Sequence, residues 1–355
     1  MAKTQITISI ENLAPVNGTS LTPFWFGFHD GNFDTYDRGR PASQGVERIA
    51  EDGTTEAITQ EFNQAGFGTI QGVVAGANGP IAPQETARFT VAVDGRNSQN
   101  AYFNYAAMLL PSNDFFVANG NERAHQIFDQ QGNFLQTDFI LLGSNVLDAG
   151  TEVNDEIPAN TAFFGQQTPD TGVSEKGVVR QAGGFIPGGA ILSDRRFANG
   201  DFTADGYQVV RIRLFNTISG DEGNDDLLGT RQDDLIIGNA GADRLFGLRG
   251  NDALEGGEGD DILRGGSGDD LLNGGTGFNR LAGGAGKDVF AIAAGEGSST
   301  IVDFNAGDRF RVTGLQFADL AIEQSRGSTV IRAGVDELAV LRNTAASSIT
   351  ESLFA

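Results

Sequence analysis

The chain has 355 residues and a formal net charge of −23. This length suggests two or three domains, and the charge argues against nucleic acid as a partner, which requires a basic face. There is no cysteine, so disulfide bonds and thiolate metal sites are excluded. The acidic balance favours cations as partners, although solubility alone would also explain it.

The first residues predict a β-strand. In residues 4–10, Ile6, Ile8 and Ile10 alternate with polar residues and do not form the apolar core of a cleavable signal peptide. No segment is long and apolar enough to span a bilayer. We therefore expect no transmembrane segment, and export by a route other than classical N-terminal secretion.

Short strand-like segments separated by turn residues continue through residues 1–215. Residues 88–93 would point Phe89 inward, and residues 102–110 form a further strand. Residues 46–64 are expected to form one or two short helices. The pattern predicts an all-β domain, an antiparallel β-sandwich with helical insertions.

Four motifs within residues 4–213 occur in a fixed order: Phe24-Trp-Phe-Gly-Phe-His-Asp-Gly31, Gly45-Val-Glu-Arg-Ile-Ala-Glu-Asp-Gly53, Met108-Leu-Leu-Pro-Ser-Asn-Asp-Phe-Phe116 and Asp148-Ala-Gly-Thr-Glu152. Together they resemble the spondin domain of the F-spondin family, in its bacterial form. The resemblance implies an eight-stranded antiparallel sandwich with calcium at one end, held by Asp114, Asp148 and Glu152. Three carboxylates suit a hard cation, but the family usually has Asp where this chain has Glu152. The alternative is that Asp114 and Asp148 only stabilise turns.

From residue 220 to residue 291 the chain repeats every nine residues, eight times without a gap. Each unit follows Gly-Gly-x-Gly-x-Asp-x-apolar-x, the calcium-binding repeat-in-toxin nonapeptide, with departures at Gln232 and Phe278. The sixth positions are Asp225, Asp234, Asp243, Asp252, Asp261, Asp270, Asn279 and Asp288. The eighth positions are Leu227, Ile236, Leu245, Leu254, Leu263, Leu272, Leu281 and Phe290.

This spacing predicts a calcium-bound parallel β-roll over residues 216–291. In each unit six residues would form a glycine turn and three a short strand whose apolar residue points inward. Two units complete one coil, so calcium would lie between carboxylates of stacked turns, such as Asp252 and Asp270. Asp261 would face Asn279, which removes one charge. Because unneutralised carboxylates repel, we expect folding of the roll to require calcium; the alternative is a glycine-rich linker.

Residues 292–355 contain the phrase Asp303-Phe-Asn305, strand-like runs and a loosely apolar end. This segment resembles the flanking region and terminal signal of repeat-in-toxin proteins exported by bacterial type I secretion. The resemblance implies a β cap on the roll, the type I secretion machinery as a partner, and a secreted, extracellular or cell-surface location. The end could also be a plain terminal strand that covers the open end of the roll.

These features predict a secreted calcium-binding protein that is not an enzyme and that binds an unidentified extracellular surface or matrix component. The alternatives are a secreted hydrolase and a structural subunit of a surface layer. The only histidines are His29 and His125, the latter expected in a short helix, and neither a His-Glu-x-x-His nor a Gly-x-Ser-x-Gly motif occurs. A carboxylate pair for glycoside hydrolysis stays open.

Overall fold

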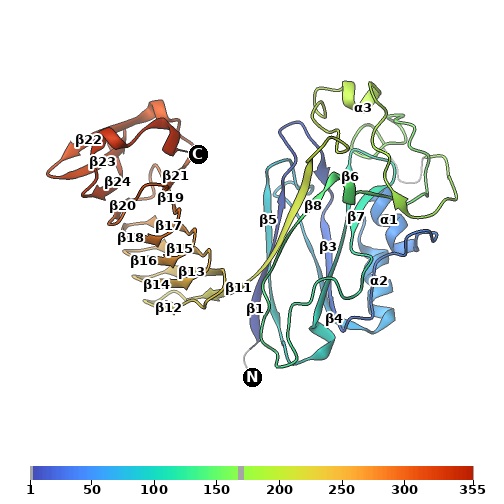
Figure 1. Ribbon diagram of the computed structural model, residues 1–355, viewed down its shortest axis with the longest axis horizontal. Helices are drawn as coiled ribbons and strands as arrows, with labels where there is room; N and C mark the ends of the chain where they lie inside the picture. The colour runs from blue at the N-terminus through green and yellow to red at the C-terminus, as the bar shows by residue number, and fades with distance from the viewer. Residues whose placement is uncertain (1–2, 167–171, 355) are drawn as a thin grey trace. The chain divides into compact units, whose positions relative to one another are not determined.

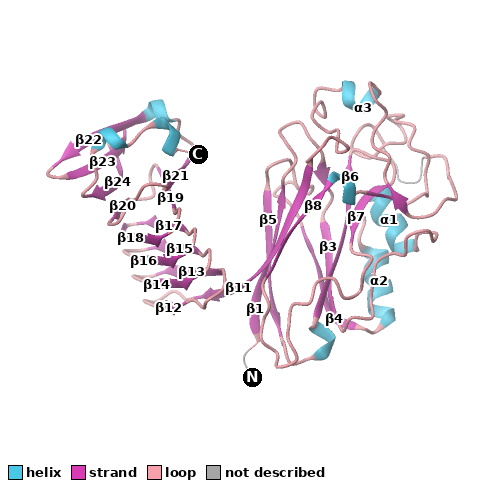
Figure 2. Ribbon diagram, in the orientation of Figure 1, coloured by secondary structure: helices cyan, strands magenta, loops and turns pink. Residues whose placement is uncertain are grey.

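The computed structural model describes residues 3–166 and 172–354. By its internal contacts the chain divides into two compact units, residues 1–214 and residues 215–355. Strands predominate in both, as Figure 2 shows by colour. Among the described residues, no helix combines the length and the apolar character that crossing a bilayer requires.

Two antiparallel sheets form the first unit. One has the order β5 (Thr86–Val93), β1 (Thr4–Asn12), β11 (Gln208–Ser219) and β8 (Thr137–Leu142). The other contains β4 (Gly68–Val74), β3 (Phe24–His29), β6 (Tyr102–Leu110), β7 (Phe115–Ala118), and the two-residue strands β2 (Ser20–Leu21), β9 (Leu147–Asp148) and β10 (Arg180–Gln181). Among the described residues of this unit, eight strands have four residues or more. This is the number of strands that the resemblance to spondin domains implies.

The main core of this unit lies between the two sheets and includes Ile8, Phe26 and Ile212, each fully buried. Phe89 points inward as predicted, and its ring lies 5.5 Å from that of Phe26. It nevertheless stays 40% exposed, because β5 is an edge strand and has no neighbour on its outer side.

Two helices cover the outer face of the second sheet. They are α1 (Gln44–Asp52) and α2 (Glu56–Ala65), which begin two residues before and end one residue after the range predicted for helices. Phe62 of α2 packs edge-on against Trp25 of β3, with ring centroids 5.5 Å apart. Both faces of β3 are therefore buried, which explains why its sequence is apolar almost throughout. Short turns of helix, α3 (Ala190–Ser193), η1 (Ser98–Asn100) and η2 (Gly143–Asn145), lie in the connections.

The second unit is a parallel β-roll. One sheet contains β13 (Asp234–Ala240), β15 (Ala253–Glu258), β17 (Leu271–Thr276), β19 (Val289–Ala293) and β21 (Arg309–Thr313). The other contains β12 (Asp226–Leu228), β14 (Arg244–Arg249), β16 (Ile262–Ser267), β18 (Phe278–Ala285) and β20 (Ser298–Ile301). Neighbouring strands are offset by two repeats, so that Leu245 pairs with Leu263 and Leu254 with Leu272. Figure 1 shows these strands as successive rungs.

Apart from β12, which has the predicted three residues, the roll strands are longer than predicted. Strand β14 has six residues, not three, because it continues through Gly247 and the next two residues of the following repeat. Only the residues around the later glycine bend. At Gly259, for example, φ is +129° and an added Cβ would lie 1.9 Å from the carbonyl oxygen of Gly241, so both the conformation and the close stacking require glycine. The eighth-position side chains from Ile236 to Phe290 form the core and are fully buried.

A small antiparallel extension follows the roll. It contains β24 (Asp336–Arg342), β23 (Ser328–Ala333) and β22 (Leu320–Ser325), with the short turns η3 (Phe317–Asp319), η4 (Ala346–Ser348) and η5 (Glu351–Leu353). The end of the chain folds back on the last coil, where the ring of Phe354 stacks on Phe310 at 5.0 Å. Arg309 also donates a hydrogen bond to the carbonyl oxygen of Ser352 at 3.2 Å.

Candidate calcium sites

The sixth-position residues of the repeats form two ladders. One contains Asp225, Asp243, Asp261 and Asn279, and the other contains Asp234, Asp252, Asp270 and Asp288. In each step, a backbone N–H donates to the Oδ1 atom of the residue eighteen positions later. The bond from Asp252 N–H to Asp270 Oδ1 is 2.8 Å long, and that from Asp261 N–H to Asn279 Oδ1 is 2.9 Å. The sequence-predicted pairs are thus adjacent in space.

In five of these residues the second carboxylate oxygen is available for a cation. The Oδ2 atoms that are buried without a hydrogen-bond partner among the described residues belong to Asp243, Asp252, Asp261, Asp270 and Asp288. An added Cβ on Gly247 would lie 2.2 Å from Asp252 Oδ2 and 2.5 Å from the carbonyl oxygen of Gly265. Carboxylate and carbonyl oxygens thus approach each other around a space that only glycine leaves open. These are the ligand types that Ca²⁺ prefers, so the residues fit calcium.

The electrostatics of the ladder also favour a cation. Burial, together with the carboxylates of Asp270 and Asp234, raises the pKa of Asp252 to about 8. Burial and the neighbouring carboxylate of Asp288 raise the pKa of Asp270 to about 7. The charged forms are therefore unfavourable without a counter-ion, and a bound cation would favour them.

Each end of one ladder is completed by a residue outside the sixth positions. At the start, Asn216 of β11 donates from Nδ2 to Asp234 Oδ1 at 2.9 Å. At the end, Asp288 N–H donates to Oδ1 of Asp308, a buried residue beyond the repeats, at 3.0 Å. Sequence reasoning missed Asp308 because it follows Asp288 by twenty residues instead of eighteen. The dipeptide Gly307-Asp308, which resembles the interior of a repeat, was the available signal.

Sequence reasoning also missed a second, outer ladder at the fifth position of the repeats. Here the side chain accepts and the later backbone donates, which is the reverse of the inner ladder. Asn251 N–H donates to Asp233 Oδ1 at 2.7 Å, Asp269 N–H to Asn251 Oδ1 at 2.7 Å, and Lys287 N–H to Asp269 Oδ1 at 2.8 Å. Repeated Asn or Asp immediately before the sixth position was the signal in the sequence.

The structure brings Asp114 and Asp148 together, and Asn154 donates from Nδ2 to both carboxylates, at 2.9 Å and 3.4 Å. Asp114 also accepts from the N–H groups of residues 151 and 152, and Arg180 forms an ion pair with Asp148 at 3.2 Å. Glu152 Oε1 accepts from Gly172 N–H at 2.8 Å. Burial and the Asp148 carboxylate raise the pKa of Asp114 to about 6.

Each of these three carboxylates thus accepts hydrogen bonds from protein donors. Within residues 3–166 and 172–354, no three Asp, Glu, His or Cys side chains converge as a metal-binding group. In the roll, a calcium ion would be held by two stacked side chains together with backbone carbonyl oxygens, so three converging side chains would not be needed there. Calcium at Asp114, Asp148 and Glu152 therefore stays a prediction from the resemblance.

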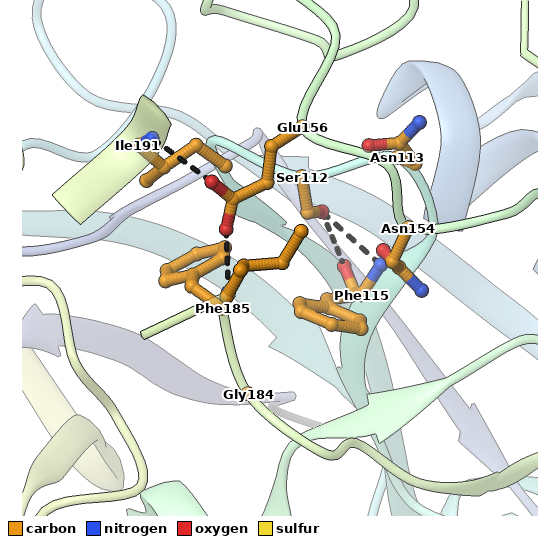
Figure 3. A pocket seen from close by; sticks show the side chains of 9 residues that line it. Ser112, Asn113, Phe115, Asn154, Glu156, Gly184, Phe185 and Ile191 are labelled. Carbon is orange, nitrogen blue, oxygen red and sulfur yellow. Dashed lines mark hydrogen bonds between the residues drawn. The ribbon is translucent and has the colours of Figure 1, made fainter. Parts of the chain in front are cut away.

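Two hollows lie beside these residues. An open depression of about 440 Å³ is lined by Asp148, Asn154, Glu175 and Arg180 among others. A small hollow of about 10 Å³, enough for about one water molecule, lies beside Phe115. There the buried Glu156 carboxylate accepts hydrogen bonds from the backbone N–H groups of Ile186 and Ile191, at 2.6 Å and 3.1 Å, as Figure 3 shows in close-up.

Neither histidine lies in these hollows. His29 is fully buried at the end of β3, and its Nδ1 accepts from Gly31 N–H at 3.1 Å. His125 stacks on Phe139 at 4.0 Å, and it lies in a loop, so the expectation of a helix there was wrong. Burial lowers the pKa of both imidazoles to about 4.

Comparison with protein families identifies both parts of the chain. The RTX calcium-binding nonapeptide repeat matches four times, over residues 219–254, 237–272, 246–281 and 264–301. Residues 15–158 match Spondin_N. The chain therefore contains calcium-binding RTX repeats and a spondin domain, which confirms the two resemblances seen in the sequence. A comparison with curated proteins found no match.

Several solved structures resemble part of the chain. The AlgE6R3 subunit of the Azotobacter vinelandii mannuronan C5-epimerase is 27% identical over 38% of this chain and 80% of its own, with a TM-score of 0.26. The AlgE6R2 subunit of the same enzyme is 26% identical over 39% of this chain and 91% of its own, with a TM-score of 0.24. The extracellular lipase LipA from Serratia marcescens is 16% identical over 39% of this chain and 40% of its own, with a TM-score of 0.23.

Proposed function

We propose that the protein is a secreted, non-catalytic, calcium-binding protein that attaches to a cell-surface or matrix component and whose roll folds when it meets extracellular calcium. The observation that carries this proposal is the row of buried Oδ2 atoms from Asp243 to Asp288 without hydrogen-bond partners among the described residues. Such a stack of carboxylates is unfavourable until a cation neutralises it.

Three features support a location outside the cell. RTX repeats are typical of secreted proteins. A roll that folds only with calcium would stay unfolded at low cytosolic calcium and fold at extracellular concentrations. The chain has no cysteine, and bound metal is a way to stabilise an extracellular fold without disulfides. Export by type I secretion is the route that the terminal segment suggests.

The histidines support a role without catalysis. His29 is fully buried and His125 is stacked on an aromatic ring, so neither is placed to take a proton from a substrate. We propose that the spondin domain provides contact with the partner. The depression beside Asp148 and Arg180, with charged groups of both signs, is the region we assign to this contact.

A calcium titration of the full chain tests the folding switch. Circular dichroism should show a cooperative gain of β-structure with calcium and none with magnesium. Trp25, the only tryptophan, is buried in the first unit, so its fluorescence should stay constant while the roll folds. A spectrum unchanged between chelator and excess calcium would contradict calcium-coupled folding.

A binding assay tests the attachment. Full-length protein should be retained by isolated bacterial envelopes or by matrix polysaccharide in calcium. A variant with Arg180→Ala, which alters the depression, should be retained less. Arg326→Ala, in the turn between β22 and β23 of the second unit, should behave as the native protein does. Equal retention of both variants would argue against the depression as the contact region.

A further inference from the structure

The two outer faces of the β-roll differ in chemistry. Side chains alternate along each strand, as in β18, where Phe278 and Arg280 are exposed while Asn279 and Leu281 are buried. The same alternation exposes Arg244 in β14 and Arg264 in β16. In the opposite sheet, strands β13, β15, β17 and β19 contain no arginine, and the exposed Arg309 and Arg311 lie on β21, at the end of that sheet.

The register brings these residues into one patch. Arg244 pairs with Ile262, which pairs with Arg280 on the next strand. Phe246 pairs with Arg264. Since neighbouring strands are about 4.8 Å apart, Arg244 and Arg280 are about 10 Å apart along the stack, with Ile262 between them. We call this patch the arginine face; it consists of Arg244, Phe246, Ile262, Arg264, Phe278 and Arg280.

The guanidinium groups of this face are available to a partner. Arg264 lies over the ring of Phe246, 5.7 Å from its centroid, which fixes the side chain without using its hydrogen bonds. Arg244 makes only a long contact of 3.6 Å with an exposed aspartate, Asp226. Within the described parts of the chain, Arg264 and Arg280 form no ion pair. Phe278 is 77% exposed, although large apolar side chains are usually covered.

This concentration of positive charge contrasts with the chain as a whole, which carries −23. A membrane surface or a duplex of nucleic acid is broad and would meet many acidic groups besides these arginines. A single extended polyanion contacts only a narrow strip, and charges more than about 8 Å away are largely screened at physiological salt. Charge complementarity thus favours a linear chain with carboxylates at intervals.

We propose that the arginine face binds an extended acidic polysaccharide. The guanidinium groups of Arg244, Arg264 and Arg280 would hold its carboxylates through charge-assisted hydrogen bonds, which Arg can form in pairs. The rings of Phe246 and Phe278 would contact the less polar faces of the sugars. This inference goes beyond the proposed function, because it makes the roll itself a binding surface, whatever the spondin domain contacts.

The test measures binding of full-length protein, in excess calcium, to a short fluorescently labelled oligogalacturonate. The test variant carries Arg244→Gln, Arg264→Gln and Arg280→Gln. We expect its dissociation constant to rise at least about tenfold, since each lost charge-assisted bond weakens binding by a factor of several or more. Circular dichroism in calcium should match the native protein, which separates loss of binding from loss of folding.

The matched control carries Arg311→Gln, Arg326→Gln and Arg342→Gln, three exposed arginines of the same unit outside the arginine face. Its affinity should stay within about twofold of the native value, because it loses the same charge elsewhere. A neutral dextran oligomer should not bind. Equal loss in both variants, binding of dextran, or binding to anionic vesicles in place of the oligogalacturonate would overturn the proposal. If the protein does not fold in calcium at all, the proposed function fails first, and the spectrum shows it.

Discussion

Replacing Asp252 with asparagine should have opposite effects on calcium binding and on the calcium-free roll. Asn279 already occupies a sixth position and accepts the same hydrogen bond, so Asp252→Asn should keep the bond from Asp234 N–H. What it removes is the charge. Asp252 is shared between the steps to Asp234 and to Asp270, so calcium should bind at least about tenfold more weakly on both sides.

The gain in calcium-free stability follows from the pKa of Asp252. It is raised from 3.8 to about 8, mainly by burial, so the folded roll holds this proton more tightly than the unfolded chain does. The contribution that protonated Asp252 makes to the stability of the calcium-free roll is therefore lost as the pH rises from about 4 to about 8. At pH 7 the shift corresponds to about 4 kcal/mol before solvent screening, and we expect about 2 kcal/mol after it.

Two measurements check this reasoning. Isothermal titration calorimetry gives the calcium affinity, and urea titration in chelator and sucrose, which favours compact states, gives the calcium-free stability. The control is Asp269→Asn, which removes one charge from the exposed outer ladder, where Asn251 shows that asparagine is accepted. If Asp252→Asn left both quantities unchanged, or altered them no more than the control does, the buried charge would not be what couples this roll to calcium.

Three further substitutions or conditions test other parts of the structure. Gly259→Ala should destabilise the calcium-loaded roll by about 2 kcal/mol or more in a thermal melt, since the new Cβ would clash with a carbonyl oxygen. Gly295→Ala, which has open space around it, should destabilise the roll less. Burial lowers the pKa of His29 to about 4, so the first unit should lose up to about 3 kcal/mol of folding stability as the pH falls from 6.5 to 4. Unfolding followed by tryptophan fluorescence measures this loss, and His29→Gln should flatten the pH dependence. Glu156→Ala should destabilise the first unit by about 2 kcal/mol, because the N–H groups of Ile186 and Ile191 lose their acceptor; Glu156→Gln should be less destabilising in a urea titration.

The repeats made the roll predictable, because glycine, aspartate and leucine recur at fixed positions. The period of nine with two units per coil fixed which carboxylates stack, and the pairs of Asp252 with Asp234 and Asp270 lie as the spacing required. Strand length was underestimated, because glycines were assigned entirely to turns. In β14, Gly247 continues the strand between Phe246 and Leu248.

The residues that break the period were not predictable from it. Asp308 joins the ladder from a loop whose length differs from a repeat, so its place depends on how that loop folds. In the first unit, the alternation of apolar residues indicated strands but not what covers them. The sequence of β3 is apolar on both faces, but this pattern alone did not show that α2 covers one of them through Phe62.

The surroundings of Asp148 show why the spondin-like motif was a weaker guide. A motif gives the order of carboxylates along the chain, but not which donors reach them first. Arg180 and Asn154 come from other segments, and their bonds to Asp148 arise only from the three-dimensional fold. Local spacing is therefore a good guide where neighbours in space are set by a repeat, and a poor one where loops meet.

The assignment of successive repeats to opposite sheets sets a unit of growth for the roll. A duplication or deletion of eighteen residues would add or remove one whole coil and leave every later side chain on its original face. A change of nine residues would transfer all later arginines to the other sheet and present each strand to the wrong neighbour. We therefore expect the roll to tolerate the gain or loss of repeats in pairs and to be disrupted by the gain or loss of a single nonapeptide.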